Sequence, residues 1–355
     1  MPDRLHPDLA ELAAAVHVVS ATEYRLLGEP RVLNRPLAAE GGGEADPGAL
    51  LRAALEGEIY SRLYVRPQPV PRGTSGPAEQ RDFIGALSAA NCGAGCWEPG
   101  WRVMGVEEDG RVAVSRDAVT FWTGTEGVRC ASGAPREGAF CRVRVGKELR
   151  HLLPGFYCAI GDGDGAAGDD GTDRLVRVYW HLTADVAADY MGEATRRLNA
   201  ARIPFRTKVL SDPGGYDRAD AGVLYLERRH FAAARPAVAA LQRRFTGALR
   251  PQVPMFSRAL APGVGVAEDP GDGRSFGQAR AAVATRALWQ AFLRGEVDEP
   301  ARREALVRGF RDAGLDPDRP HLCPGSEDRY DLAPARVRAG RTRRRRTAAL
   351  PGRGR

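Results

Sequence analysis

Lysine is almost absent from this 355-residue chain: only Lys147 and Lys208 occur among 52 basic residues, and the rest are arginine. An arginine side chain keeps its charge in proteins, whereas its surroundings can make a lysine amine neutral and basic. A position that must lose a proton cannot be arginine. Each of the two lysines is therefore a candidate for a role that arginine cannot fill.

Long apolar runs are also missing. No stretch approaches the roughly 18–20 apolar residues that a membrane helix needs, and Asp3 and Asp8 stand where a signal peptide would be basic and then apolar. With 43% hydrophobic and 27% charged residues, the composition excludes wholesale disorder and collagen-like fibres. The sequence predicts a globular cytoplasmic protein that does not contact membranes.

Metal-ligand patterns are sparse. The six cysteines form no CxxC motif, and Cys92 and Cys96 have no second pair to complete a zinc site, so reduced and mostly buried thiols are expected. The segment 161–171 has Asp162 and Asp164 at a spacing typical of calcium loops. It lacks the closing glutamate of an EF-hand and is interpreted as a flexible loop. No metal and no cofactor are predicted.

The net charge of +7 comes from one end of the chain. Residues 331–355 hold nine arginines and one aspartate, which leaves the other 330 residues at about −1. This tail shows no apolar periodicity that could offset the entropy cost of ordering it. We expect a solvated, disordered tail, with contact to nucleic acid or to an anionic surface as the less favoured alternative.

The N-terminal part reads as helices followed by short strands. Helical patterns span 8–27 and 46–64, and a period of two indicates strands at 101–106, 111–114 and 119–122. A soft boundary is placed near residue 136. The predicted divisions are 1–135, a helical and short-strand region that could bind a peptide or leader, then 136–330, a catalytic domain, and 331–355, the tail.

The following region alternates strands and helices. Strands are predicted at 140–145, 174–182, 205–210 and 222–226, and helices at 185–201, 231–246, 276–294 and 300–314. The pattern predicts an α+β fold with a mixed sheet flanked by helices, a helical N-terminal region and a disordered basic C-terminal tail.

Two residues of this region suit acid–base chemistry. Alternation places Val176, Val178 and Trp180 on an apolar face of their strand, and His181 on the opposite face. A strand–helix–strand unit can bring His181 close to Lys208. A neutral lysine could remove a proton while histidine donates one, provided that burial and nearby guanidinium groups lower the lysine pKa from about 10.4 toward about 7–8. A histidine satisfied within the core is the alternative.

Arginines follow the same strands, and clustered guanidinium groups suit a phosphate, which accepts bidentate contacts. A segment rich in glycine and proline, 260–277, leads into a predicted helix whose N-terminus could receive an anion. It matches neither the P-loop nor the GxGxxG motif, and an ordinary structured turn is the alternative. The arginines in or near these loops are Arg206, Arg218, Arg258, Arg274 and Arg280.

These residues carry a family resemblance. The run His181-Leu-Thr, the run Lys208-Val-Leu-Ser-Asp212, and the segments 216–225 and 261–277 resemble the HopA-type effector family of type III secretion. Actinobacterial members of that family include lyase subunits of class V lanthipeptide and thioamitide pathways. The His…Lys-Val…Arg order is similar to that of phosphothreonine lyases, which eliminate phosphate without metal or cofactor. The resemblance covers roughly residues 80–330.

The resemblance implies a role for each matched residue. Lys208 would be the base, His181 the general acid and Arg218 the best-matched phosphate ligand. The related lyases carry a lysine where this chain has Tyr179, and Lys147 from another strand is the candidate replacement for that charge, or else a surface lysine. The further site candidates are Arg258, Arg274 and Arg280 for phosphate, with Arg206 and Tyr225 beside them.

The implied activity is a phosphoserine or phosphothreonine lyase that converts a phosphorylated precursor peptide to dehydroalanine or dehydrobutyrine. A separate kinase subunit must phosphorylate the peptide, because the sequence has no kinase Gly-rich loop, VAIK-like strand or HRD motif. A cyclase subunit is a further expected partner, and nucleic acid is not. Two alternatives remain open: a non-catalytic peptide-binding partner of a modifying complex, and a secreted effector acting on host proteins.

Overall fold

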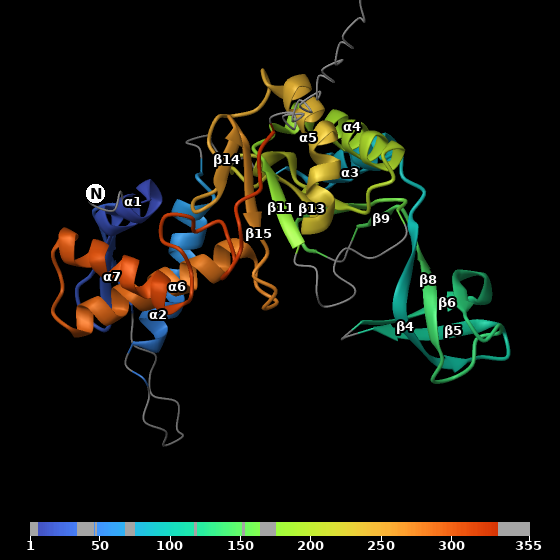
Figure 1. Cartoon of the computed structure of the whole chain (residues 1–355), viewed down its shortest axis with the longest axis horizontal. Coiled ribbons are helices and arrows are strands. Elements are labelled where there is room, and N and C mark those ends of the chain that lie inside the picture. Colours follow the sequence, from blue (N-terminus) through green and yellow to red (C-terminus); the bar gives the residue numbers. More distant parts are fainter. Residues whose placement is uncertain are drawn as a thin grey trace, which may run out of the picture.

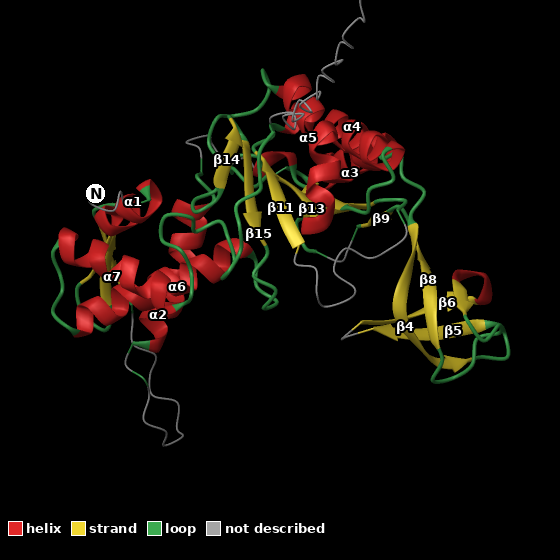
Figure 2. Ribbon diagram, viewed as in Figure 1, coloured by secondary structure: helices red, strands yellow, loops and turns green. Residues whose placement is uncertain are grey.

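The computed structural model describes residues 6–33, 46, 48–67, 75–116, 119–150, 153–163 and 175–332. Over these residues the chain forms three antiparallel sheets and seven α-helices (Figures 1 and 2). The predicted α+β class is confirmed. No helix in these ranges is both long and apolar enough to span a bilayer.

A seven-stranded sheet forms the centre. Its order is β14-β15-β11-β13-β12-β10-β9, and every strand pair in the described residues is antiparallel. The predicted mixed sheet is therefore corrected: β11 and β12 run in the same direction, but β13 lies between them and pairs with both. The strands are β9 (Glu148–Leu149), β10 (Phe156–Ile160), β11 (Leu175–Trp180), β12 (Arg206–Leu210), β13 (Gly222–Glu227), β14 (Arg258–Ala261) and β15 (Val264–Glu268).

One face of this sheet is covered by α3 (Pro77–Ala90), α4 (Ala187–Ala200) and α5 (Phe231–Phe245) (Figure 1). The predicted apolar face of β11 is confirmed, because Val176, Val178 and Trp180 are fully buried against these helices. Alternation along the strand then places Arg177 and Tyr179 on the opposite face. The structure thus separates a packed face from the face that carries the polar candidates.

The opposite face is partly covered by a second helical group. It consists of α1 (Pro7–Ala15), α2 (Ala49–Glu58), the π-helix η1 (Ile59–Tyr64), α6 (Phe276–Leu293) and α7 (Glu299–Asp312), with a small sheet of β1 (Val16–Val18), β2 (Glu23–Leu26) and β3 (Glu29–Val32). Its core includes Tyr64 and Phe276, and meets the central sheet at Tyr179. A Cβ at Gly277 would lie 2.4 Å from the Tyr64 ring, so only glycine allows η1 and α6 to pack this closely.

A five-stranded sheet extends away from the central sheet (Figure 2). It consists of β4 (Cys96–Val106), β5 (Arg111–Arg116), β6 (Val119–Gly124), β7 (Val128–Cys130) and β8 (Phe140–Val145), in the order β6-β5-β4-β8-β7. Its core contains residues of this sheet alone, among them Trp101, Val103 and Val114. Because β8 pairs with both β4 and β7, the boundary predicted near residue 136 falls inside this sheet.

Short 3-10 helices link several of these elements. They are η2 (Thr125–Gly127), η3 (Ala184–Val186), η4 (Pro213–Gly215) and η5 (Arg228–His230).

The last described residues pack against the body. The Tyr330 hydroxyl donates to Glu268 at 2.6 Å, its ring meets Phe231 edge-on, and Asp331 pairs with Arg235 at 3.0 Å. Beyond Leu332, the predicted tail lies outside the described residues. The packed body therefore continues slightly into the range 331–355 that the sequence assigned to the tail.

Deleting residues 333–355 should leave the melting temperature and any turnover unchanged, because the contacts that anchor Tyr330 and Asp331 to the body precede the deletion. Binding to heparin should weaken and lose part of its salt dependence, since the deletion removes nine arginines. As a comparison, Tyr330→Phe should lower the free energy of unfolding by about 1.5–3 kcal/mol, because buried Glu268 loses a hydrogen bond. Thermal and denaturant unfolding measure both, and a large loss of stability in the deletion variant would contradict the expectation.

Candidate functional site

A cavity of about 320 Å³ lies on the less covered face of the central sheet. Strand register explains which side chains meet there. Tyr225 of β13 is paired with Arg177 on one side and Arg206 on the other, and Lys208 is paired with Cys158. Paired residues of antiparallel strands point to the same face. All five residues line the cavity, together with Asp269 after β15.

Lys208 is the centre of this arrangement. Its Nζ lies 4.0 Å from the ring centroid of Phe156 and 5.8 Å from that of Tyr225. Burial, and then the nearby charge of Arg177, lower the pKa of Lys208 from its ordinary value of 10.5. These surroundings make the neutral amine of Lys208 easier to form than that of a lysine in water.

Two arginines bring positive charge to the same cavity. Arg177 donates from Nε to Asp269 at 2.7 Å, and its guanidinium lies 5.4 Å from the centroid of the Tyr225 ring. Arg206 pairs with Glu98 of β4. Each guanidinium has five N–H donors in a planar fork, and one carboxylate does not use all of them. The cavity can therefore receive a phosphate.

Two other groups in the cavity stay protonated at neutral pH. Burial raises the pKa of the Tyr225 hydroxyl above its ordinary value of 10.0 and the pKa of the Cys158 thiol above 9.0. Tyr225 is thus an O–H donor rather than an anion, and Cys158 is not a thiolate nucleophile.

His181 lies elsewhere, just beyond the end of β11, and it does not line this cavity. The prediction that His181 lies close to Lys208 is corrected. Strand β13 lies between β11, which ends next to His181, and β12, which carries Lys208, so the two strands are two spacings of about 4.8 Å apart. His181 is completely buried, and its Nδ1 lies 3.0 Å from the carbonyl oxygen of Gln252.

That contact fixes the protonation of the ring. Burial lowers the pKa of His181 below 6.5, so the ring is neutral at pH 7. A carbonyl oxygen only accepts hydrogen bonds, so the proton sits on Nδ1. Nε2, which has no hydrogen-bond partner among the described residues, then carries a lone pair and no proton. In this state His181 accepts a proton and does not donate one to a leaving group.

Arg218 is engaged beside the cavity rather than inside it. Its Nη2 donates to Asp220 at 2.9 Å and to the Tyr60 hydroxyl of η1 at 3.2 Å. Tyr179, the residue in place of the related lyases' lysine, is buried in the second core against Phe276, with ring centroids 6.4 Å apart. Neither lines the cavity.

Two predicted phosphate ligands are structural. Arg258 pairs in register with Val266, which puts it on the helix-covered face opposite Lys208, and its guanidinium pairs with Asp328. Arg280 is buried in α6 and donates to the carbonyl oxygens of residues 320 and 322, at 2.8 and 2.9 Å. Arg258 thus holds the C-terminal segment to β14, and Arg280 holds it to α6.

The other two cations also lie away from the cavity. Arg274 is exposed in the loop before α6 and lies 3.8 Å from Glu56. Lys147 donates to the carbonyl oxygens of Ser88 and Asn91, at 2.8 and 3.0 Å, and so closes the C-terminal end of α3.

The glycine-rich segment before α6 forms β14, β15 and a turn. At the N-terminus of α6 a capping box already occupies the first amides: Gln278 N–H donates to the Ser275 hydroxyl, and the Gln278 side chain accepts from Ser275 N–H. The structured-turn alternative therefore fits this segment better than an anion site.

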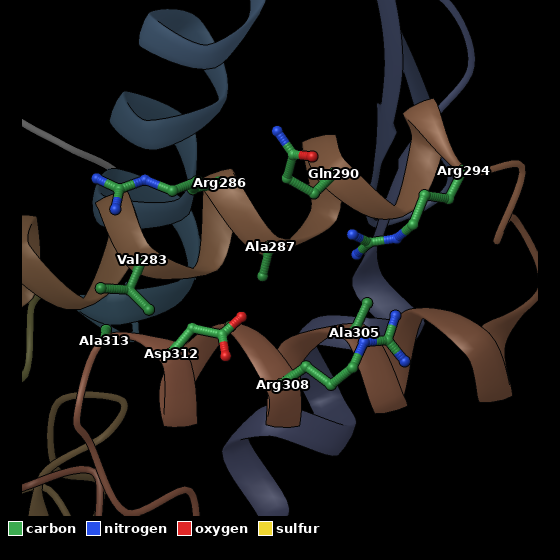
Figure 3. A pocket seen from close by; sticks show the side chains of 10 residues that line it. Val283, Arg286, Ala287, Gln290, Arg294, Ala305, Arg308, Asp312 and Ala313 are labelled. Atoms are coloured by element: carbon green, nitrogen blue, oxygen red, sulfur yellow. The ribbon is translucent and has the colours of Figure 1, made fainter.

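Other hollows lack a lysine. One of about 120 Å³ lies between α6 and α7, where the side chains of Arg294 and Arg308 extend toward each other (Figure 3). Arg308 and Arg294 share Glu296. A third hollow, of about 400 Å³, runs along α7, and three arginines of that helix are among its lining residues.

Sequence reasoning missed Arg177 and Asp269. Arg177 shares a strand face with Tyr179 and His181, so alternation was the signal that could have found it. Asp269 follows β15 and reaches the cavity only through the pairing of β15 with β11. Within the described ranges, no group of three or more His, Cys, Asp or Glu side chains could hold a metal ion.

The cavity brings the partly desolvated amine of Lys208 and two guanidinium groups together on an antiparallel sheet. Residues 149–322 match the HopA1 effector protein family. The HopA-type resemblance is thereby confirmed over that range, which includes every residue of the cavity described above.

Two solved structures are similar to the chain. An effector protein from Pseudomonas syringae pv. tomato strain DC3000 aligns with 76% of this chain and 90% of its own length, at 19% identity and a TM-score of 0.44. An effector protein from Pseudomonas syringae pv. syringae strain 61 aligns with 75% of this chain and 88% of its own, at 15% identity and a TM-score of 0.39. A comparison with curated proteins gave no match.

Proposed function

We propose that this chain eliminates phosphate from phosphoserine or phosphothreonine in a precursor peptide, giving dehydroalanine or dehydrobutyrine. The observation that carries the proposal is the partly desolvated amine of Lys208, enclosed with Arg177 and Arg206 in one cavity. The match to the HopA1 family over residues 149–322 is consistent with it.

In the proposed reaction, Arg177 and Arg206 bind the phosphate oxygens and orient the phosphorylated side chain. The neutral amine of Lys208 removes the Cα proton. The electron pair of the C–H bond forms the Cα=Cβ double bond, and the Cβ–O bond breaks. The departing phosphate takes a proton on its bridging oxygen, and Lys208 leaves the step as an ammonium group.

The cavity and the resemblance indicate different residues as the proton donor. The resemblance implies His181, whereas the cavity contains Tyr225, whose raised pKa keeps its proton at neutral pH. Tyr225 is the O–H donor that shares the cavity with the amine of Lys208, so base and donor can act on one substrate. We therefore assign the donor to Tyr225 within this proposal.

The burial of His181 away from Lys208 also favours a second candidate function. A chain that binds a phosphopeptide without eliminating phosphate, as a partner in a modifying complex, needs the two arginines but no aligned acid. Either function requires a separate kinase, with a cyclase subunit acting on the product of the first. The division into an N-terminal peptide-binding part and a catalytic part from residue 136 to 330 belongs to the same proposal.

The test is product analysis with the purified full chain and synthetic phosphoserine and phosphothreonine peptides. Elimination releases phosphate and leaves a dehydroamino acid, detected as an adduct with a thiol by mass spectrometry. The reaction should persist in excess EDTA, because an amine base needs no ion; loss on chelation and recovery with Mg²⁺ or Zn²⁺ would overturn the metal-free mechanism. Phosphate release that restores serine would mean hydrolysis and would overturn the lyase. Binding without release would support the second function.

The pH dependence of turnover should report Lys208. The rate should rise with pH along a limb whose midpoint lies below 10.5, since the neutral amine is the active form. The Phe156 ring attracts the ammonium form by about 0.5–2 kcal/mol. Phe156→Leu should therefore lower the lysine pKa further and move the limb toward lower pH by about 0.4–1.5 units.

The matched control is Phe83→Leu, which removes a half-buried ring that packs on Tyr216. Its rate profile should keep the original limb. A shift of the Phe156→Leu limb toward higher pH would contradict a cation–π contact with Lys208.

A further inference from the structure

The five-stranded sheet has one face without a covering layer. Its inner face packs on itself through Trp101, Val103 and their neighbours. The outer face follows from the register, in which Trp97 pairs with Arg144, Arg102 with Phe140, and Arg129 with Arg142. We call this outer surface the aromatic–arginine face and define it by Trp97, Trp122, Phe140, Arg102, Arg129 and Arg144.

Aromatic side chains on this face lie in water. Phe140 is 74% exposed and Trp122 is 50% exposed. Trp122 pairs with Ala113, while the neighbouring Phe121 packs inward at 5.0 Å from Trp101. Of the two large rings of β6, Phe121 packs in the core and Trp122 faces the solvent, where it contributes nothing to the core. Exposed aromatic rings of this kind are typical of binding surfaces.

The same face is positively charged. The Arg129 guanidinium lies 3.9 Å from the Trp97 ring centroid, and Arg144 donates to the carbonyl oxygens of Gly95 and Ala94, at 3.0 and 2.6 Å. Rings and carbonyls position these guanidinium groups without neutralising them. Among the residues of the five strands, no carboxylate shares this face, since Glu98 points to the inner side.

The sheet is linked to the Lys208 cavity through its inner side. Glu98 of β4 accepts from Arg116 of β5 at 2.8 Å and also from Arg206, which lines the cavity. The sheet therefore stands next to the place where the phosphorylated residue would sit. The family match begins at residue 149, so this sheet lies outside the matched range and adds a surface to the catalytic part.

We infer that the aromatic–arginine face docks an extended, acidic segment of the peptide substrate, at a distance from the phosphorylated residue. Arginines pair with the carboxylates of the segment, and the rings cover its apolar side chains. The strand β6 is the edge of the sheet, so its outer backbone groups can pair with an added strand. That the bound peptide is the substrate rests on the proposed function. That the face binds an acidic peptide rests on its exposed rings and arginines.

The experiment measures fluorescence anisotropy of a labelled peptide of alternating glutamate and valine with the full chain. The double variants Arg102→Glu/Arg129→Glu and Trp122→Ser/Phe140→Ser should each bind about tenfold more weakly or worse, a loss of at least about 1.4 kcal/mol. Arg286→Glu and Leu293→Ser on α6, both exposed and distant from this sheet, are the matched controls and should bind as the wild type does. Circular dichroism and melting temperature confirm that each variant folds.

Three outcomes would overturn the inference. The first is unchanged binding of the glutamate–valine peptide by both double variants. The second is equally tight binding of a lysine–valine peptide by the wild type. The third is tighter binding of a labelled oligouridine that is lost in the same variants, which would make the face a nucleic-acid surface. Failure here is distinguishable from failure of the lyase. A short phosphopeptide that cannot reach the face should be turned over equally by the double variants, whereas Lys208→Arg should keep the anisotropy signal and lose turnover.

Discussion

Replacing Lys208 by arginine should reduce phosphate elimination by a factor of about 10³ or more, near the upper range for loss of a general base. Arginine keeps the positive charge and almost the length of the side chain, but it does not become neutral in proteins. Phosphopeptide affinity should stay close to that of the wild type, because Arg177 and Arg206 remain. Single-turnover phosphate release measures the chemical step, and phosphopeptide anisotropy measures the binding.

The chain offers a matched control for this substitution. Lys147→Arg makes the same change at the other lysine, which donates to two carbonyl oxygens behind α3 and does not line the cavity. This variant should eliminate phosphate at the wild-type rate. Turnover by Lys208→Arg within a few-fold of the wild type would remove Lys208 from the role of base.

Replacing Tyr225 by phenylalanine should lower elimination from a phosphothreonine peptide by about 10²–10³-fold, because the departing oxygen loses its proton donor. The ring stays in place between Arg177 and Lys208, so binding should change little. On an analogue with a sulfonate leaving group, which departs as a stable anion, the same variant should lose much less. Lys208→Ala should be impaired on both substrates, since removal of the Cα proton is common to them.

His181→Gln provides the comparison. It should lower stability, because the buried ring and its contact with the Gln252 carbonyl are lost. Its effect on turnover should be the same for both substrates. A loss confined to the phosphothreonine peptide in His181→Gln, with none in Tyr225→Phe, would return the acid role to His181 and would require its ring to reach the substrate.

The sequence predicted the two faces of β11 well, because side-chain alternation is a local property. Val176 and Val178 are core residues, and Arg177, between them in the sequence, lies on the opposite face and lines the cavity. The insertion of β13 between β11 and β12 could not be predicted in this way. Which strands become neighbours depends on packing between segments far apart in the chain, so the sequence did not show that β11 and β12, the strands next to His181 and of Lys208, are separated by β13.

The arginines show a second limit of sequence reasoning. In a chain with only two lysines, arginine performs structural tasks as well as binding. Arg280 satisfies backbone carbonyls, and Arg258 pairs with Asp328 on the far side of the sheet. The sequence does not distinguish an arginine that donates to backbone carbonyls from one that would bind phosphate in the proposed function. Only burial and partners, which the fold determines, separate Arg177 and Arg206 from the rest.

The position of Tyr225 on β13 has a consequence for how the site tolerates change. Tyr225 is the register partner of Arg177 on β11 and of Arg206 on β12, and its ring lies between Arg177 and Lys208. Substitutions at these positions share one neighbour, so their energetic effects should not add. The effect of replacing one of the four residues should therefore depend on which residue stands at the other three positions. Evolution or design of a new leaving-group preference would then have to proceed through concerted changes on three adjacent strands.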